Sequence, residues 1–580
     1  MINRFSAALL RFTQRNQGIH QMIVNFSPER ERFEITPGSS QGESSLIKAG
    51  WSLDKRRFVC YVRSPEMLRG ISDMASFAPE VAKRFRSHEI AIAFSHAASG
   101  DNLSIPCPEG CSYYNFQEIG VVYAMQRAKT LIGDQPGLGK TKQAMGVINA
   151  SPDINNILIA MPSLLKKNWV RELEGWLTRD LTIGVADTAY LPRTNIVICS
   201  YDSMRKLRPE FDRRCRELDK KHFDMLIADE SQYLKNPNAQ RTKAIFGSVF
   251  RNKIVGAPLV FEKEIYLSGT PMVNKPRDMW GLIARCDPND LGAVKTHFGI
   301  RYCQGWQAPW GFDDSGASNL TELKNRLRGT FMIRRLKKDV LHDLPSKVRR
   351  IVVLRPNKEA EAALRKEREL FELNIKVINK AIDMAEASVR EDEEVAYKED
   401  ALGMKLGAIA KDARGKDLPL FEQLSTLRAE LAIAKAPLMV TYAKLRLEEH
   451  DKIVIFAHHK SLQLALMNGL QQCNIVTILG SDSEDARDLA VYRFQHDPKV
   501  RVAICALTLA VGITLTKARY AFLAELDWRP SVNEQAEDRL HRITQEREVL
   551  IEHVVLDGST DALMVKRIIK KMENIEAALD

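Results

Sequence analysis

Short apolar runs alternate with amphipathic stretches along two parts of the chain. Between about residues 115 and 345, such runs are ILIAMP, TNIVICSY, MLIADE and EIYLSGTP. The same rhythm returns after about residue 435 with KIVIFAHH, VRVAICA, YAFLAEL and VLIEHVV. Runs of this kind are typical of parallel strands joined by crossover helices. The pattern predicts an α/β fold with two tandem parallel-sheet lobes, over residues 101–345 and 435–580.

Two other stretches have a different pattern. Residues 346–434 become rich in Glu, Lys, Ala and Leu, which predicts a helical insertion between the lobes. Its charge pattern fits a nucleic-acid-gripping element and a plain spacer equally well. Residues 1–100 predict a small α+β module, in which AGWSLDKRRFVCYV reads as a hairpin that turns at Asp54 and Lys55.

Composition narrows the class of protein. Of the 580 residues, 45% are hydrophobic and 27% are charged, which is the balance of a soluble globular protein. No run approaches the roughly 20 apolar residues of a membrane-spanning helix, and the nine cysteines lack the spacing of a disulfide framework. The net charge of +11 attracts polyanions, and it fits a nucleic-acid partner or an ordinary basic surface equally well.

The first residues, MINRFSAALLRFTQRNQ, are basic, but their apolar part is too short for a secretory signal. A mitochondrial address is a weaker alternative. It stays open because acidic residues are absent from this stretch, as they are from mitochondrial transit peptides. We expect a cytoplasmic, nucleoid-associated protein of a bacterial or phage-infected cell, or a nuclear protein if the chain is eukaryotic.

The segment TLIGDQPGLGKTKQAM carries the strongest chemical signal in the chain. It joins an apolar strand and a glycine-rich turn to a helix that opens with Lys140 and Thr141. Gly137 and Gly139 let backbone N–H groups approach an anion, which the positive end of the helix also attracts. Lys140 would reach the β- and γ-phosphates of a nucleotide, and the Thr141 hydroxyl would bind Mg²⁺.

The loop departs from the strict pattern G-x-x-x-x-G-K-T, because Asp134 stands where the first glycine is expected. A second element supports the nucleotide site. Asp229 and Glu230 end the apolar run MLIA, at the sheet edge where phosphates bind. Asp229 would hold Mg²⁺ through its water shell, and Glu230 would orient and deprotonate the attacking water. The alternative is an acidic pair that caps the following helix.

The order of these segments resembles helicase superfamily two, and specifically the Swi/Snf-type translocases, from about residue 115 to 555. YLKNPNAQRTKA and LSGTPMVNKPRDMW look like this branch, while RYCQGW and FMIRRLKKDVLHDLPSK are similar to its HepA-related, annealing-helicase group. The resemblance implies two RecA-like lobes that use ATP and Mg²⁺. It also implies an ATP-dependent translocase that moves along double-stranded DNA and remodels branched DNA or protein–DNA complexes.

The resemblance assigns further residues to the nucleotide site. YYNFQEIGVVYA looks like the adenine-reading segment, in which Gln117 hydrogen-bonds the adenine edge. The closing motifs of the second lobe place Gly512 and Gln535 beside the nucleotide, and Arg539 and Arg542 fit the arginine-finger motif. Planar guanidinium groups donate paired hydrogen bonds to the γ-phosphate as charge develops there. The alternative is a salt-bridged helix surface with the neighbouring acids Glu534, Glu537 and Asp538.

The DNA contacts follow from the resemblance alone. Segments similar to the family's DNA-contact motifs contain the candidates Pro162, Ser163, Trp169, Ser200, Tyr201 and Trp528, although single residues of these types also occur in cores. Ser268, Gly269 and Thr270 would link hydrolysis to the strand-binding surface. Ser231 departs from the DEAH-like pattern, which leaves the coupling contact of that motif open.

Trp51, Phe58 and Tyr61 of the N-terminal module are candidates for stacking on DNA, with core packing of the hairpin as the stronger alternative. Expected partners are double-stranded or branched DNA and DNA-bound proteins, with no membrane, and we expect a monomer. A strand-separating DNA or RNA helicase and a nucleotide-dependent DNA-binding scaffold stay open as other functions. No segment of the sequence identifies a strand-separating wedge.

Overall fold

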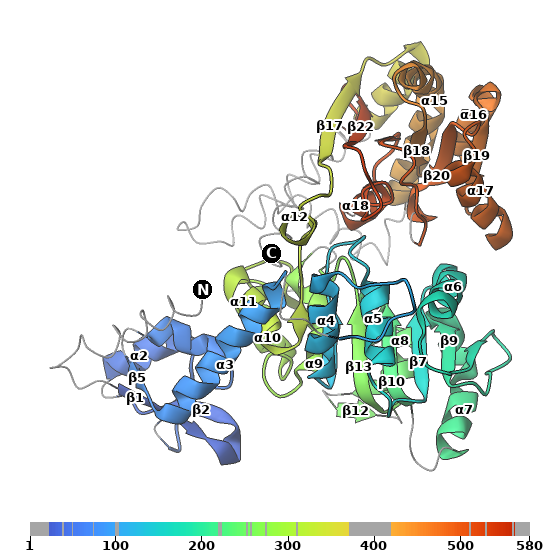
Figure 1. The fold of residues 1–580 in the computed structure, drawn as a ribbon. Helices are drawn as coiled ribbons and strands as arrows, with labels where there is room; N and C mark the ends of the chain where they lie inside the picture. The colour runs from blue at the N-terminus through green and yellow to red at the C-terminus, as the bar shows by residue number, and fades with distance from the viewer. Residues whose placement is uncertain are drawn as a thin grey trace.

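The computed structural model in Figure 1 describes residues 22–369, 419–559 and 562, apart from short gaps. The gaps are residues 38–39, 49, 58, 73–74, 99–103, 218–222, 251–252, 256–257, 273–274, 309–310, 510–511 and 528–529. Residues 370–418, the middle of the predicted insertion, lie outside the described residues. Within the described ranges, no helix combines the length and apolar character needed to cross a membrane.

The N-terminal module is built on a five-stranded sheet in the order β3-β4-β2-β1-β5. Its elements are β1 (Met22–Ser27), β2 (Arg32–Ile35), α2 (Ser40–Lys48), β3 (Ser52–Asp54), β4 (Val59–Val62), β5 (Ala75–Phe77) and α3 (Pro79–His96). The antiparallel pairing of β3 with β4 confirms the predicted hairpin.

Two of the three aromatic candidates in this hairpin have partners within the N-terminal module. Trp51 is 3% exposed and lies in the core of the module. The guanidinium of Arg32 lies 4.0 Å from the ring centroid of Tyr61 and covers it. Phe58 lies outside the described residues. Core packing therefore explains Trp51, as the alternative interpretation of the sequence expected.

Lobe 1 contains a seven-stranded parallel sheet in the order β16-β6-β13-β10-β7-β9-β8. The strands are β6 (Lys129–Ile132), β7 (Ile157–Met161), β8 (Ile183–Val185), β9 (Ile196–Ser200), β10 (Phe223–Asp229), β13 (Phe261–Leu267) and β16 (Met332–Ile333). The helices are α4 (Asn115–Met125), α5 (Lys140–Asn149), α6 (Lys166–Trp176), α7 (Tyr201–Glu217), α8 (Gln240–Phe246), α9 (Trp280–Cys286), α10 (Lys295–Tyr302) and α11 (Leu320–Thr330). Two small hairpins complete the lobe, β11 (Ser248–Phe250) with β12 (Lys253–Val255) and β14 (Trp306–Ala308) with β15 (Gly311–Asp313).

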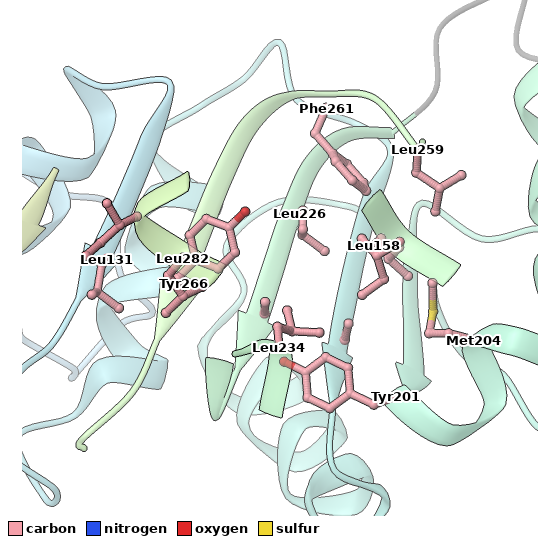
Figure 2. Packing of buried hydrophobic residues seen from close by; sticks show 14 of the residues in the cluster. Leu131, Leu158, Tyr201, Met204, Leu226, Leu234, Leu259, Phe261, Tyr266 and Leu282 are labelled. Carbon is pink, nitrogen blue, oxygen red and sulfur yellow. The ribbon is translucent and has the colours of Figure 1, made fainter. Parts of the chain in front are cut away.

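Both faces of this sheet are buried. Leu158, Leu226 and Tyr266 point into one apolar cluster, which Figure 2 shows, whereas Ile159 and Ile227 belong to the cluster on the opposite face. A strand that is buried on both faces needs a continuous apolar run rather than an alternating one. Runs such as ILIAM and MLIA satisfy this need, which explains why they form the inner strands.

Lobe 2 contains a six-stranded parallel sheet in the order β17-β22-β21-β18-β20-β19. The strands are β17 (Lys347–Leu354), β18 (Ile453–Ala457), β19 (Ile475–Ile478), β20 (Val502–Ala506), β21 (Tyr520–Leu523) and β22 (Val549–Leu556). The helices are α15 (Pro419–Glu449), α16 (Lys460–Gly469), α17 (Glu484–His496) and α18 (Pro530–Glu537). The short helix α12 (Lys337–Val340) lies in the connection between the two lobes, as Figure 1 shows.

The second lobe begins earlier in the chain than the sequence analysis placed it. β17 pairs in parallel with β22 over residues 347–354, within the stretch assigned to the helical insertion. α15 crosses the expected boundary at 434, and its residues Ala432, Ala436 and Met439 pack in the core of lobe 2. β17 was missed because it is an edge strand, with Ile351 and Val353 about half exposed, and it shows only a short apolar run before a long polar stretch.

Candidate active site

The glycine-rich loop lies between β6 and α5. Gly137 and Gly139 have φ angles of 90° and 75°, a backbone region that favours glycine. A Cβ atom at position 139 would also lie only 2.4 Å from Nε2 of Gln117. Lys140, the first residue of α5, donates from Nζ to the carbonyl oxygen of Asp134 at 2.8 Å. Its ammonium therefore turns back toward the loop, as a phosphate-binding lysine requires.

Asp134, which replaces the expected glycine, anchors a second segment of lobe 1 to the loop. Its fully buried carboxylate accepts hydrogen bonds from the backbone N–H of Arg335 at 2.9 Å and from Nε2 of Gln143 at 2.8 Å. Nη2 of Arg335 forms an ion pair with the same carboxylate at 2.5 Å. Arg334 donates from Nη1 to the carbonyl oxygen of Gly133 at 2.7 Å. The departure from the strict motif thus has a structural cause, because Asp134 is the counter-ion of Arg335.

The two candidate catalytic carboxylates end β10. The indole N–H of Trp169 donates to Oδ2 of Asp229 at 2.8 Å, and the hydroxyl of Tyr201 donates to its carbonyl oxygen at 2.7 Å. Burial and the neighbouring charge of Glu230 raise the pKa of Asp229 to about 6. Glu230 has a φ of 49°, which is a strained conformation for this residue type, and its side chain does not cap the following 3₁₀ helix. The capping alternative is therefore wrong.

A chain of hydrogen bonds, which we name the coupling relay, connects Glu230 to lobe 2. Gln232 donates from Nε2 to Oε2 of Glu230 at 2.7 Å and accepts from Oγ of Ser268 at 2.8 Å. Oγ of Ser268 accepts from the backbone N–H of Thr270 at 3.1 Å. Gln535 of lobe 2 donates from Nε2 to Oγ1 of Thr270 at 3.4 Å. The fourth residue of DESQ, Gln232, thus contacts both Glu230 and Ser268, and it is our candidate for the coupling contact that the sequence left open.

The two arginines of lobe 2 face this site. A Cβ atom at Gly137 would lie 3.1 Å from Cγ of Arg542, so Arg542 lies against the phosphate-binding loop. Burial and the charge of Arg539 lower the pKa of Arg542 to about 9. Burial also lowers the pKa of Arg539, and the nearby carboxylates of Glu230 and Asp229 oppose this shift. The structure therefore brings Arg539 and Arg542 together with the lobe 1 carboxylates.

The neighbouring acids have other partners. Asp538 lies 2.9 Å from Nζ of both Lys337 and Lys347. Glu537 pairs with Arg349 at 2.6 Å and with Nε2 of His553 at 3.0 Å. Within the described ranges, no ion pair joins Arg539 or Arg542 to these acids. The salt-bridged-surface alternative does not hold for either arginine.

Sequence comparison agrees with this arrangement of two lobes. Residues 90–406 match the SNF2-related domain, and residues 435–544 match the helicase conserved C-terminal domain. The chain belongs to the SNF2-related family. This confirms the Swi/Snf-type resemblance drawn from the sequence.

Two curated relatives are similar over most of this SNF2-related chain. The SWI/SNF-related matrix-associated actin-dependent regulator of chromatin subfamily A-like protein 1 of Xenopus tropicalis is 32% identical over 86% of this chain and 48% of its own length. The DNA annealing helicase and endonuclease ZRANB3 of Mus musculus is 30% identical over 77% of this chain and 39% of its own length. The chain thus spans about half or less of the length of these relatives.

A solved structure, the Sulfolobus solfataricus SWI2/SNF2 ATPase core in complex with dsDNA, is 21% identical to this SNF2-related chain. The match covers 82% of this chain and 96% of that one, with a TM-score of 0.36. A likeness this weak supports no conclusion about the geometry of the site.

Two further residues expected at the nucleotide site, Gln117 and Thr141, lie at the phosphate-binding loop. A third, Gly512, lies elsewhere. Gln117 donates from Nε2 to the carbonyl oxygen of Leu138 at 3.1 Å, so it lies against the phosphate-binding loop. Thr141 follows Lys140 in the first turn of α5. A Cβ atom at Gly512 would lie 2.5 Å from Cδ2 of Leu165, which places this glycine at another contact between the lobes.

Three of the expected DNA contacts are buried and support the catalytic carboxylate or a helix start. Trp169 and Tyr201 are at most 1% exposed and hold Asp229 through their hydrogen bonds. Ser200 is 3% exposed and accepts at Oγ from the backbone N–H of Ser203 at 3.2 Å, at the start of α7. The burial of these residues supports the core-packing alternative, and their interpretation as DNA contacts stays a prediction.

The remaining DNA candidates are Pro162, Ser163 and Trp528. Pro162 and Ser163 follow the end of β7, and Ser163 is exposed. Trp528 lies outside the described residues. The sequence analysis did not select Lys167, which lies beside this motif on α6 and pairs with Asp485 of lobe 2 at 2.5 Å. The signal for Lys167 that the sequence offered was a basic residue close to the DNA-contact candidates Pro162 and Ser163.

Proposed function

We propose that this SNF2-related chain is an ATP-dependent translocase that moves along double-stranded DNA and remodels branched DNA or protein–DNA complexes. The observation that carries the proposal is the seam between the lobes. Lys140, Asp229 and Glu230 of lobe 1 lie there together with Arg539 and Arg542 of lobe 2. Such a site gains its full set of charges only when the two lobes are close, which is the requirement for coupling hydrolysis to motion.

The residues present suit ATP and Mg²⁺. The glycines and Lys140 would bind the phosphates, while Thr141 and Asp229 would hold the metal ion. ATP with Mg²⁺ supplies the phosphoryl group and neutralises part of its charge. Glu230 would accept a proton from the attacking water, and its conformation is fixed by its backbone and by Gln232. Arg539 and Arg542 would stabilise the charge that develops during transfer.

Motion would follow from the coupling relay. Because Glu230 connects through Gln232, Ser268 and Thr270 to Gln535, a change at Glu230 would reach lobe 2 through this chain of hydrogen bonds. Pro162, Ser163 and Trp528 stay candidates for DNA contacts. Contacts to phosphates would make binding independent of sequence and weaker in salt. We also propose a monomer in the cytoplasm or nucleus, in accordance with such a substrate.

The test compares ATP hydrolysis with duplex DNA, forked DNA, single-stranded DNA and RNA at two salt concentrations. We expect the largest stimulation with duplex or forked DNA and a fall in apparent affinity as salt rises. A triplex-displacement assay beside a fork-unwinding assay then separates translocation from strand separation. Fork unwinding without triplex displacement would favour the helicase, and hydrolysis that no nucleic acid stimulates would favour the scaffold.

A further inference from the structure

One short segment of lobe 1 contacts the phosphate-binding loop and the arginine-bearing segment of lobe 2 at the same time. Arg334 and Arg335 bind the loop through Gly133 and Asp134. Lys337 follows them at the start of α12, in the connection between the lobes. The segment is therefore attached firmly to the loop on one side before it reaches lobe 2.

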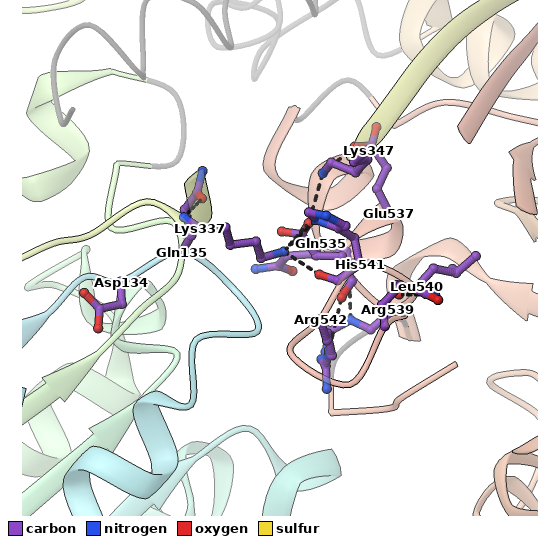
Figure 3. Close-up of polar contacts among 12 residues, drawn as sticks. Asp134, Gln135, Lys337, Lys347, Gln535, Glu537, Arg539, Leu540, His541 and Arg542 are labelled. Atoms are coloured by element: carbon purple, nitrogen blue, oxygen red, sulfur yellow. Dashed lines mark hydrogen bonds and ion pairs between the residues drawn. The ribbon is translucent and has the colours of Figure 1, made fainter. Parts of the chain in front are cut away.

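Lys337 contacts both lobes through different atoms. Its backbone N–H donates to Oε1 of Gln135, a residue of the phosphate-binding loop, at 2.7 Å. Its Nζ donates to Oδ1 of Asp538 at 2.9 Å and to the carbonyl oxygen of His541 at 2.5 Å. The residue is only 6% exposed. Figure 3 shows Lys337 between Gln135 and the lobe 2 segment that contains His541.

The lobe 2 partners of Lys337 stand directly beside the two arginines. Asp538 immediately precedes Arg539, and His541 immediately precedes Arg542. Arg542 also donates from Nε to the carbonyl oxygen of Asp538 at 3.1 Å. Fixing Asp538 and His541 from the side of the phosphate-binding loop thus fixes the backbone from which both guanidinium groups extend.

We propose that Lys337 is a positioning residue that seats the Arg539–Arg542 segment on the phosphate-binding loop, so that the arginines reach the γ-phosphate only when the loop and lobe 2 are connected through it. The proposal rests on the proposed ATPase function. It deepens that function by naming the contact that couples the loop to the arginines.

The charge of this bridge depends on pH. Burial and the cations of Lys347 and Arg542 lower the pKa of Lys337 to about 8, while Asp538 opposes the shift. His541, the other group facing Lys337, is neutral near this pH because burial and Lys337 lower its pKa to about 4. Below about pH 8 the ammonium is protonated and pairs with Asp538. Above it the ion pair is lost, so the bridge should weaken as pH rises.

The first test replaces Lys337 with methionine, which keeps the length of the side chain and removes its charge. Asp538 keeps Lys347 as a partner, so the variant leaves no unpaired buried carboxylate. We expect kcat for ATP hydrolysis to fall about 10- to 100-fold, with KM for ATP changed less than about 2-fold. Lys338→Met, at the exposed neighbouring position, should behave as the wild type. A K337M enzyme with wild-type kcat would overturn the proposal.

The second test uses Lys337→Arg, because a guanidinium has a much higher ordinary pKa than an ammonium and, beside Asp538, keeps its charge as pH rises through 8. We expect wild-type kcat to fall as pH rises through about 8, and K337R to retain part of the activity without this fall. If kcat of K337R still falls as pH rises through about 8, another group causes the fall, and the ion pair between Lys337 and Asp538 is not its cause. Thermal unfolding of each variant shows whether it is folded.

A third measurement does not depend on hydrolysis. Hydrogen–deuterium exchange of the nucleotide-free protein should be faster in K337M than in K338M at residues 133–140 and at residues 535–545. Equal exchange at both segments would contradict the bridge even if the protein is an active ATPase. Conversely, a wild type that hydrolyses no ATP would refute the proposed function while the exchange result still decides the bridge.

Discussion

Asp229 of lobe 1 and Asp538 of lobe 2 are held by different means. In lobe 1, Asp229 receives hydrogen bonds from neutral groups, namely the indole of Trp169 at 2.8 Å and the backbone N–H of Glu230 at 2.9 Å. In lobe 2, Asp538 lies 2.9 Å from each of two ammonium groups. Burial raises the pKa of Asp229 to about 6. Burial acts the same way on Asp538, but Lys337 and Lys347 overcome it and hold its pKa below the ordinary value.

This difference matches the two proposed tasks, in which Asp229 takes part in the chemical step and Asp538 helps to position the arginines. Neutral donors fix the orientation of Asp229, which we propose as a ligand of the metal ion. Full ion pairs satisfy Asp538 and Glu537 and leave the neighbouring arginines with their charge available to a phosphate. Since removing one partner of a buried pair leaves an uncompensated charge, the lobe 2 network fixes geometry more than it adds stability. The following changes test this contrast, from the largest expected effect to the smallest.

The largest effect is expected at the lobe 1 groups themselves. Lys140→Ala and Glu230→Gln should each reduce kcat by about 1,000-fold or more, because each removes a group assigned to the chemical step. Glu230→Gln should still bind ATP, since it keeps the size of the side chain, which equilibrium binding of a fluorescent nucleotide would show. Glu174→Gln, at an exposed position of α6, is the matched control. Turnover near the wild-type rate in either variant would refute the assigned role.

Next come the lobe 2 arginines. Arg539→Ala and Arg542→Ala should each lower kcat by about 100- to 1,000-fold, because the guanidinium charge then no longer meets the transferring phosphate. Lysine at either position should restore little, since it lacks the planar pair of donors. Arg547→Ala, at an exposed position of the same segment, should hydrolyse ATP normally. Steady-state kinetics with saturating DNA decide; full activity with lysine would mean that charge alone suffices.

The coupling relay should give a selective defect. Gln232→Ala removes both the bond to Glu230 and the bond from Ser268. We expect DNA-stimulated hydrolysis to fall about 10-fold, which corresponds to about 1.4 kcal/mol, with a smaller change in the rate without DNA. Gln240→Ala, at the exposed start of α8, is the control. Equal loss with and without DNA would show that Gln232 serves only the chemical step.

Trp169→Phe tests whether this residue serves Asp229 or DNA. The variant loses one hydrogen bond to a carboxylate, for which we expect about a 10-fold lower kcat and unchanged DNA affinity. Trp176→Phe is a matched control on the same helix, because its N–H donates to the hydroxyl of Tyr113 at 2.8 Å instead. Weaker DNA binding with normal hydrolysis would support the interpretation of Trp169 as a DNA contact.

The smallest effect concerns stability. Because the pKa of Asp229 is raised to about 6, the folded protein binds a proton that the unfolded chain has released between about pH 4 and 6. Its free energy of unfolding therefore falls as pH rises through this window. Asp229→Asn removes the effect and should stabilise the metal-free protein at pH 7 by about 1–3 kcal/mol. Thermal unfolding with a chelator should show a higher Tm at pH 7 and little difference at pH 4; a lower Tm at pH 7 would contradict this.

The sequence predicted the features that depend on neighbouring residues. The apolar runs of β7 and β10, the glycine turn before Lys140 and the carboxylates after a strand are all local signals, and the structure contains them in the expected order. The motif order identified the family, which the comparisons confirm. Roles for the DNA candidates and for the nucleotide contacts stay predictions.

Features that depend on distant pairs were not predictable in this way. Asp134 meets Arg335, and Lys337 meets Asp538, across 201 positions of the chain in each case. A side chain such as Trp169 also looks alike in the sequence whether it faces solvent or supports a carboxylate. The burial of Trp169 is decided by which strand ends converge at the sheet edge. The edge strand β17 was hard to predict for a similar reason, because its partner β22 lies far along the chain.

The pairing of β17 with β22 has a consequence for synthesis on the ribosome. Residues 347–354 are made long before their hydrogen-bonding partners at 549–556. Since β17 is the edge strand of its sheet and β22 is its neighbour there, the apolar side chains of Val352 and Leu354, which pack against the core of lobe 2, must wait uncovered until β22 has emerged. Completion of the second lobe thus waits for the synthesis of this late strand, and this interval is when chaperones would protect it.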